Sequence, residues 1–231
     1  MPLRGRRCVE QGLQQLGSLF STRYPILKQF GDAVILCGGK SRRMQFDKAF
    51  AKIDDRYIIE IIYEKLSMCF DTVKLCADTK ERVRAFGIET IEDKASKGIG
   101  PAVGIYSALE QATSRYVFVT ACDMPLIDAA HIRAMMQYLA NNEHTPDALV
   151  PMNGDYIEPL HSFYATSMLP MLEAELADGN YRIHRILDKC DTQYLEDTFS
   201  QRFDADLAMF TNINTMEDLA RVAKMLPKGE D

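Results

Sequence analysis

The sequence lacks two features that would direct it to a membrane or a nucleic acid. No hydrophobic run is long enough to cross a bilayer, although 47% of the 231 residues are hydrophobic. Positive charge is also in deficit, since the formal net charge is −6 at pH 7. A protein that binds the phosphate backbone of a nucleic acid needs a broad basic face. We therefore expect no membrane and no nucleic-acid polymer among the partners of this chain.

Spacings typical of metal-binding or disulfide-rich proteins are missing as well. The six cysteines form no CxxC pattern, the histidines form no HxxxH pattern, and a secretory signal peptide is not evident. We expect reduced, mostly buried thiols and a cytoplasmic location. Because Cys37, Cys76 and Cys122 end predicted strands, a soft-metal site remains an alternative to simple packing of these thiols.

The first residues differ in composition from the rest. Residues 1–31 carry apolar side chains at helical spacing and contain a single acid, Glu10. Their bases are Arg4, Arg6, Arg7, Arg23 and Lys28. The segment is either a targeting peptide or an extension that packs loosely on the protein. We assign residues 1–31 as a basic N-terminal extension and residues 32–231 as a single domain.

Predicted strands and helices alternate through the first half of this domain. Apolar and β-branched residues predict strands at 34–36, 72–77, 87–93 and 115–123. Apolar residues at helical spacing follow these strands, and Asp54 and Asp55 are predicted to cap the first helix. Repeated strand–helix units imply a parallel sheet with right-handed crossovers.

The pattern changes beyond residue 147. DALVPM and EPLHSFY are predicted as strands joined by a turn at 153–155, and helices are predicted at 165–177 and 181–190. A capping box at 215–218 begins a final helix. The expected fold is therefore α/β, a Rossmann-like three-layer α/β/α arrangement whose mostly parallel sheet has a mixed C-terminal part.

A glycine pair interrupts the first predicted strand. Gly38 and Gly39 allow the backbone to approach a ligand, and their amides can bind an anion. Four bases follow in the same loop: Lys40, Arg42, Arg43 and Lys48. A Walker A loop is excluded because Val34 occupies a position that needs glycine, and GxGxxG is absent. The loop is either a phosphate site of another design or an ordinary turn with a solvated basic face.

Ligands of open parallel sheets bind at the carboxyl ends of the strands, which places Gly38, Asp93 and Asp123 on one edge. Asp123 directly follows the apolar run VFVTAC, where it can ligate Mg²⁺ or merely end the strand and cap the next turn. Asp93 lies in an acidic patch, and taken alone this pattern favours surface solvation over ligand binding.

Five segments together resemble one known family. ILCGGKSRRMQFDKAF is similar to the signature of the molybdenum cofactor guanylyltransferases, and four later segments agree in order: GIGPAVGI, TACDMP, EPLHSFY and NINTMEDL. The resemblance covers roughly the whole chain after the first thirty residues. Departures occur at Cys37, Gln45 and Cys76, where the family usually has Ala, Gly and Asn.

The resemblance implies a nucleotide-diphospho-sugar transferase fold and an Mg²⁺-dependent enzyme. It would transfer GMP from GTP to the phosphate of a molybdenum-pterin cofactor and release pyrophosphate, and proteins that deliver or receive this cofactor are possible partners. The implied nucleotide-binding residues are Leu36, Cys37, Gly38, Gly39, Lys48, Cys76 and Asp93. The implied catalytic residues are Lys48, Arg43 and Asp123, with Asp123 as the metal ligand.

Two other functions stay open. The same chemistry could act on a cytidine nucleotide or a sugar phosphate, although the double glycine favours guanine. Alternatively, the chain could be a nucleotide sensor or cofactor chaperone without turnover.

Several polar residues have both a structural and a functional interpretation. His161 is either a core histidine or a neighbour of the acceptor, and Asn212 and Asn214 either hold a turn or reach the acceptor. The remaining three residues could meet the acceptor's phosphate or form the polar face of a helix: Tyr181, Arg182 and Arg185.

Overall fold

The computed structural model describes residues 28–38, 47–93 and 100–226. Its main sheet has the strand order β10-β7-β9-β6-β1-β4-β5, and β8 pairs with β7. The strands are β1 Lys28–Leu36, β4 Thr72–Ala77, β5 Thr90–Glu92, β6 Ser114–Ala121, β7 Ala148–Asn153, β8 Tyr156–Ile157, β9 His161–Ala165 and β10 Thr192–Leu195. A separate hairpin is formed by β2 Lys52–Ile53 and β3 Arg56–Tyr57.

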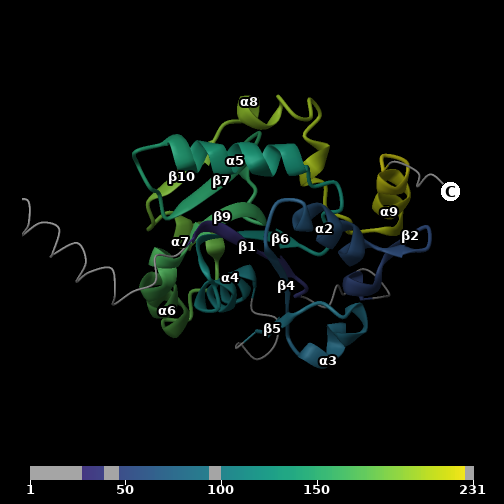
Figure 1. Ribbon diagram of the computed structural model, residues 1–231, viewed down its shortest axis with the longest axis horizontal. Helices are drawn as coiled ribbons and strands as arrows, with labels where there is room; N and C mark the ends of the chain where they lie inside the picture. Colours follow the sequence, from purple (N-terminus) through teal and green to yellow (C-terminus); the bar gives the residue numbers. More distant parts are fainter. Residues whose placement is uncertain (1–27, 39–46, 94–99, 227–231) are drawn as a thin grey trace, which may run out of the picture.

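Helices connect these strands along the chain (Figure 1). The α-helices are α2 Ile58–Ser67, α3 Lys80–Val83, α4 Pro101–Glu110, α5 Ala129–Asn141, α6 Leu169–Ala177, α7 Ile183–Leu187, α8 Asp197–Ser200 and α9 Met216–Ala223. Short 3-10 turns are η1 Lys48–Phe50, η2 Arg84–Phe86, η3 Thr166–Met168 and η4 Ala208–Phe210. Within these described residues, no helix is long and apolar enough to span a membrane.

The sheet is mostly parallel with a mixed C-terminal part, as predicted. β1 runs parallel to β4 and β6, and β4 runs parallel to β5. β9 is antiparallel to both β6 and β7, whereas β10 is parallel to β7. This arrangement confirms the α/β fold class.

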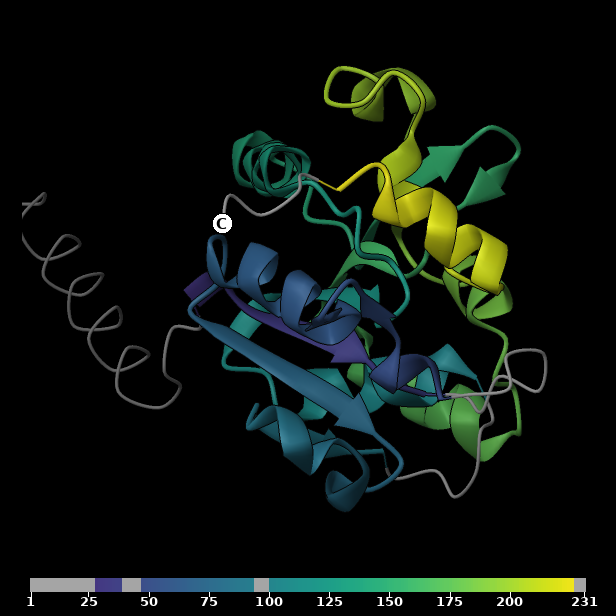
Figure 2. The same ribbon diagram turned by 90° about the vertical axis from the view of Figure 1, so that its right-hand side faces the viewer.

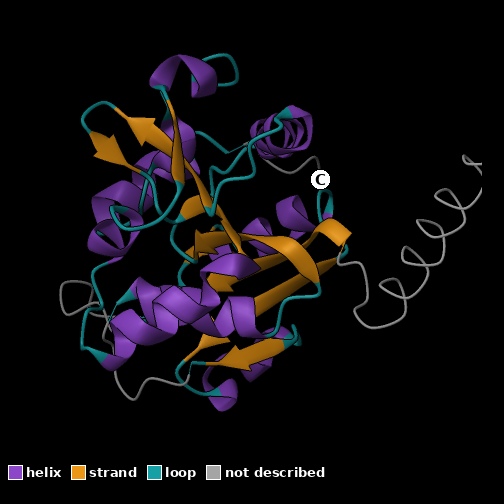
Figure 3. Ribbon diagram, turned by 90° about the vertical axis from the view of Figure 1, so that its left-hand side faces the viewer, coloured by secondary structure: helices purple, strands orange, loops and turns teal. Residues whose placement is uncertain are grey.

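Both faces of the sheet are buried under helices (Figures 1, 2 and 3). Along β1, Ala33 and Ile35 pack with residues of α2 and α5, whereas Val34 and Leu36 pack with residues of α4, α6 and α7. Successive side chains of a strand point to opposite faces, so a strand covered on both sides must be apolar throughout. The continuous apolar run therefore produces the central layer of a three-layer structure.

A buried carboxylate fixes the register between β1 and β6. Asp32 is 5% exposed and accepts hydrogen bonds from the backbone nitrogens of Thr113 and Ser114, both at 2.7 Å. With this start, Leu36 pairs with Ala121 at the other end of the two strands. The residues that follow both strands consequently leave the sheet side by side.

Three local predictions were wrong. Asp54 and Asp55 form the turn between β2 and β3, and α2 begins after Tyr57, whose backbone nitrogen is capped by the Glu60 carboxylate at 3.1 Å. The turn after Asn153 joins β7 to the short strand β8 rather than to β9. The assigned N-terminal extension also ends too late, because β1 already begins at Lys28. Its remaining residues 1–27 lie outside the described residues.

Candidate active site

The ends of β1, β4 and β6 form one edge of the sheet. The backbone nitrogen of Cys122 donates to Leu36 O at 3.1 Å, and that of Cys37 donates to Cys76 O at 2.7 Å, which extends both ladders by one residue. Asp123 follows immediately. We call this carboxyl edge of the sheet the rim.

Three distant segments meet at the rim through one ammonium group. Lys48 Nζ donates to Asp123 Oδ2 and to Asn214 Oδ1, each at 2.7 Å. We call these three residues the rim cluster. The Lys48 and Asp123 side chains are 16% and 15% exposed, so this ion pair is largely shielded from bulk water. The expected convergence of the loop lysine with the strand-end carboxylate is therefore present in the structure.

Local structure explains why each of these side chains faces the others. Asp47 caps η1 by accepting a hydrogen bond from Ala49 N at 3.1 Å, which makes Lys48 the first residue of that turn. The backbone nitrogen of Ile213 donates to Asp123 O at 2.9 Å and so ties the segment before Asn214 to the rim. The following helix, α9, starts with the predicted capping box of Thr215 and Asp218.

The oxygen donors of the rim cluster suit a hard cation. Asp123 Oδ1 is buried and has no hydrogen-bond partner among the described residues. Such an atom is costly unless a ligand satisfies it. The described residues contain no group of three or more His, Cys, Asp or Glu side chains placed to hold a metal. The unpartnered oxygen of Asp123 fits Mg²⁺, because this ion binds through one or two carboxylates and completes its shell with water and phosphate oxygens.

The loop that follows Asp123 has an anchor of its own. Lys65 Nζ on α2 donates to Pro125 O at 2.8 Å and to Ile127 O at 3.1 Å. Burial lowers the pKa of Lys65. No local sequence pattern marks this lysine, because its Pro125 partner is a backbone carbonyl sixty residues away in the sequence.

The predicted nucleotide residues that are described lie at or beside the rim. Leu36 and Cys37 are buried at the end of β1, and Gly38 is exposed, with open space around its Cα. Asp93 follows β5, where its backbone nitrogen donates to Ala77 O at 2.8 Å. Gly39 and Arg43 lie outside the described residues, as do Lys40, Arg42 and Gln45.

The three rim cysteines do not converge on one site. Cys37 and Cys122 pack on the face of the sheet that carries α2, and the pKa of Cys37 is raised by the neighbouring Cys122 thiol and by burial. Cys76 packs on the opposite face, under α4, where burial raises its pKa to about 12. A Cβ at Gly104 of α4 would lie 3.0 Å from Leu36 Cδ2, so this helix sits tightly on the strands. Simple packing, rather than a soft-metal site, accounts for these thiols.

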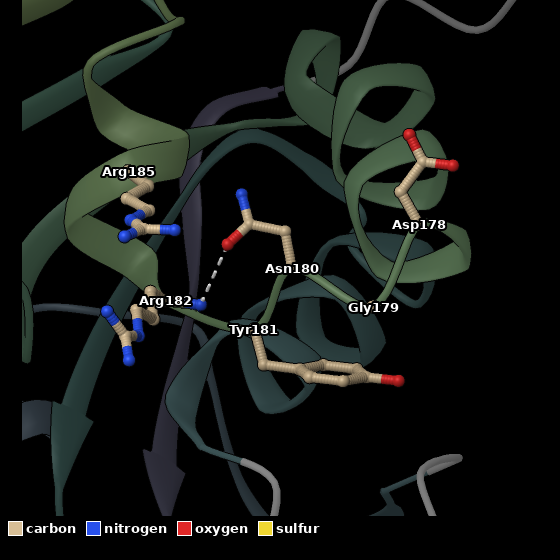
Figure 4. A pocket seen from close by; sticks show the side chains of 6 residues that line it. All are labelled: Asp178, Gly179, Asn180, Tyr181, Arg182 and Arg185. Carbon is tan, nitrogen blue, oxygen red and sulfur yellow. Dashed lines mark hydrogen bonds between the residues drawn. The ribbon is translucent and has the colours of Figure 1, made fainter.

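A cavity of about 490 Å³ opens between α6 and α7 (Figure 4). Its lining residues are Asp178, Gly179, Asn180, Tyr181, Arg182 and Arg185. Figure 4 shows both guanidinium groups on one side of Asn180 and the Asp178 carboxylate on the other. A Cβ at Gly100, just before α4, would lie 3.3 Å from Tyr181 O, so the cavity adjoins the start of α4.

Two further candidates have structural positions. Asn212 Nδ2 donates to Phe210 O at 3.3 Å and holds a turn, the first of its two interpretations. His161 is fully buried and lies in the core, which confirms the core-histidine interpretation. It belongs to a histidine cluster made of His131, His161 and Ser200. In this cluster, His131 Nδ1 lies 3.1 Å from His161 Nε2, and His131 Nε2 lies 2.9 Å from Ser200 Oγ.

Similar sequences agree on one family. The model of the MobA-like NTP transferase domain matches residues 33–195. A molybdenum cofactor guanylyltransferase of Syntrophotalea carbinolica is 36% identical over 199 residues, which cover 86% of this chain and 93% of that protein. A probable molybdenum cofactor guanylyltransferase of Peptoclostridium acidaminophilum is 33% identical and covers 86% of this chain and 90% of its own length.

Solved structures agree with the sequences. The molybdopterin-guanine dinucleotide biosynthesis protein A of Archaeoglobus fulgidus has a TM-score of 0.72 and 28% identity, covering 84% of this chain and 97% of its own. CMP:2-keto-3-deoxy-manno-octonic acid synthetase shares the fold with a TM-score of 0.61 at 12% identity. The match over residues 33–195 shows that the chain belongs to the MobA-like NTP transferase family, as the five segments together predicted, and is a nucleotidyltransferase.

Proposed function

We propose that this protein transfers GMP from GTP to the phosphate of a molybdenum-pterin cofactor and releases pyrophosphate. The observation that carries the proposal is the 2.7 Å contact between Lys48 Nζ and Asp123 Oδ2 beside the end of β1. It brings a cation and a carboxylate to the carboxyl edge of the parallel sheet, where ligands of such sheets bind. The names of the relatives suggest the identity of the two substrates. The rim cluster offers a cation and a carboxylate suited to a metal-bound triphosphate.

Transfer of a nucleotidyl group requires neutralisation of charge around the α-phosphorus and alignment of the attacking oxygen. The Lys48 ammonium binds the triphosphate, and Asp123 with its unpartnered Oδ1 holds the metal. An Mg²⁺ ion held by Asp123 would supply charge neutralisation for the phosphate oxygens and for the leaving pyrophosphate. Arg43 and the Gly38 and Gly39 amides add further contacts to phosphate oxygens in this proposal.

Guanine recognition is assigned to the backbone at the end of β1, at Leu36 and Cys37, with Asp93 as a further nucleotide contact. Cys76 is the weakest member of this set, because its thiol packs under α4 and donates toward Gly104 O at 3.9 Å. A thiol also offers poorer hydrogen bonds than the amide that the family usually has there.

No side-chain base is needed for this reaction. The attacking group is a phosphate oxygen of the acceptor, which is already ionised at neutral pH. The histidine cluster is fully buried and therefore out of reach of a substrate. The cavity beside α7 suits the acceptor's phosphate, because Arg182 and Arg185 offer planar donors that bind phosphate well.

The experiment is a pyrophosphate-release assay with the purified protein, Mg²⁺, the molybdenum-loaded pterin and each nucleoside triphosphate in turn. Release that requires both GTP and the loaded pterin supports the proposal. Release with CTP or UTP in preference to GTP would identify another nucleotidyltransferase of the same fold. Background release despite GTP binding would identify a non-catalytic nucleotide or cofactor carrier. A cytoplasmic location and exchange of the cofactor with partner proteins complete the proposal.

A further inference from the structure

One arginine outside the proposed catalytic set connects the two described flanks of the glycine loop. Arg82 lies on α3, after β4. Its Nε donates to Asp47 Oδ2 at 2.7 Å and its Nη2 donates to Asp47 Oδ1 at 2.6 Å. Its Nη1 donates to Cys37 O at 2.5 Å and to Asp78 Oδ1 at 3.2 Å. One side chain thus joins the residue that follows β1, the residue before Lys48 and the residue that follows β4.

The geometry of this contact is specific to arginine. The two parallel bonds to Asp47 use the planar fork of the guanidinium, which fixes the carboxylate in direction as well as in distance. The Arg82 side chain is only 14% exposed, so water competes weakly for these bonds. A lysine would keep the positive charge but could not make the paired contact and reach Cys37 O at once.

The Asp47 carboxylate links Arg82 to the rim cluster, because it also caps the turn that begins at Lys48. The oxygen that accepts from Arg82 Nη2 also accepts from Ala49 N and caps η1. Lys48 is the first residue of η1, and its ammonium contacts Asp123. A rotation of Asp47 would therefore change the start of η1 and with it the direction of the Lys48 side chain.

We propose that Arg82 is a positioning residue, which clamps Cys37 and Asp47 and thereby holds Lys48 against Asp123. Arg82 acts through Asp47 and contacts no substrate in this proposal. The inference rests on the proposed function for its kinetic consequence, but the placement of Lys48 can be measured without turnover.

The decisive variant is Arg82→Lys, with Arg84→Lys as the matched control. Arg84 lies two residues further, is 81% exposed and pairs with Glu81 on the surface. Arg82→Lys should lower kcat/KM about 10–100-fold, a loss typical of one charged hydrogen-bonding group removed from its partner. Arg84→Lys should change it less than twofold. Equal values for both variants would show that only charge is needed at position 82.

A second readout reports on Lys48 itself. The full-length protein is treated briefly with an amine-acylating reagent, and acylation of Lys48 and Lys52 is quantified by peptide mass spectrometry. In Arg82→Lys, Lys48 should be acylated several times faster than in the wild type, whereas Lys52 should be unchanged. Unchanged acylation of Lys48 in a folded Arg82→Lys protein would overturn the proposal.

If the Arg82→Lys protein does not fold, Asp47→Asn is a second variant that tests the proposal. Asparagine retains one oxygen for the η1 cap but loses the charged fork, so Lys48 should again be acylated faster. Unchanged acylation in this variant would also overturn the proposal. If the wild type releases no pyrophosphate, the proposed function fails, and the acylation result still decides the role of Arg82.

Discussion

The rim cluster and the histidine cluster both place polar side chains inside the fold, but they differ in charge and in access to a ligand. Each links segments far apart in the chain, and each leaves one buried atom without a partner among the described residues, Asp123 Oδ1 and His161 Nδ1. The rim cluster pairs Lys48 with Asp123 at an edge that a ligand can reach. The histidine cluster is fully buried, and burial lowers the pKa of both imidazoles.

The surroundings of the two clusters explain this difference. Aromatic rings enclose the histidines, with His131 and His161 each in contact with Phe210, and Phe118 edge-on to His161. A charge would be costly there, so the imidazoles stay neutral and stabilise the fold. At the rim, the Lys48 and Asp123 side chains pair with each other and keep 16% and 15% of their surface exposed. This difference supports the proposal that the rim cluster serves catalysis, whereas the histidine cluster serves stability.

The largest effect is expected from Asp123→Asn. Replacement of the charged metal ligand should lower turnover by about 10²–10³-fold, the range for loss of one preorganised electrostatic group. The fold should be retained, because the asparagine amide oxygen can still accept a hydrogen bond from Lys48 Nζ. Near-normal turnover in the pyrophosphate assay would remove Asp123 from the site.

His131→Ala should have the opposite effect to Asp123→Asn: it should lower stability and leave turnover unchanged. Removal of a fully buried ring and of the hydrogen bonds to His161 and Ser200 should cost about 3 kcal/mol of unfolding free energy, measured by urea denaturation. Turnover per folded molecule should stay within twofold of the wild type at 25 °C. A turnover loss as large as that of Asp123→Asn would break the distinction between the clusters.

The histidine cluster should also make stability depend on pH. The pKa of His131 is lowered to about 4 by burial, with Asp128 raising it and Arg202 lowering it further, and the pKa of His161 is lowered by burial and by His131. Below the ordinary histidine pKa of about 6.5, these two side chains therefore bind more protons in the unfolded chain than in the folded chain. This part of the stability is complete above that pH and declines as the pH falls toward 4.

The measurement is urea denaturation at pH 7.5 and pH 5.5. We expect a loss of about 1–3 kcal/mol across this interval, before most carboxylates titrate. His131→Gln should show a smaller loss, since one of the two imidazoles is gone. Equal losses in both proteins would assign the pH dependence to other groups.

The smallest effect concerns the lysine of the rim cluster. Lys48→Met should weaken GTP binding about 10-fold in calorimetry, because one charged hydrogen bond to the triphosphate is lost. Lys52→Met is the matched control: this ammonium lies 4.3 Å from the Tyr57 ring, outside the rim cluster, and its loss should leave GTP affinity unchanged. Equal GTP affinities of wild type and Lys48→Met would count against the phosphate-binding role of the loop.

The sequence predicted the part of the site that depends on strand ends. The apolar runs before Gly38 and Asp123 are local signals, and parallel pairing of their strands brings both residues to one edge. Among the four bases of the glycine loop, the family motif then indicated Lys48 as a phosphate-binding residue. These features depend on periodicity or on short motifs, which a single sequence displays.

The contacts of Arg82, Lys65 and Asn214 could not be predicted in this way. Each depends on one side chain that meets a segment far away in the chain, and such a meeting leaves no periodic pattern. For Asn214 the sequence offered a turn or a contact with the acceptor, whereas its amide oxygen accepts a hydrogen bond from Lys48 Nζ. The contact between His161 and His131 could not be predicted either. His131 lies on α5, and other residues of this helix form its apolar pattern.

The most direct test of the central claim is the effect of Mg²⁺ on GTP binding, measured by calorimetry in the wild type and in Asp123→Asn. If Lys48 and Asp123 together hold a metal-bound triphosphate, Mg²⁺ should tighten GTP binding about 10-fold or more in the wild type and have little effect in the variant. An equal gain from Mg²⁺ in both proteins would contradict the account, because the metal would then bind without the carboxylate at the rim.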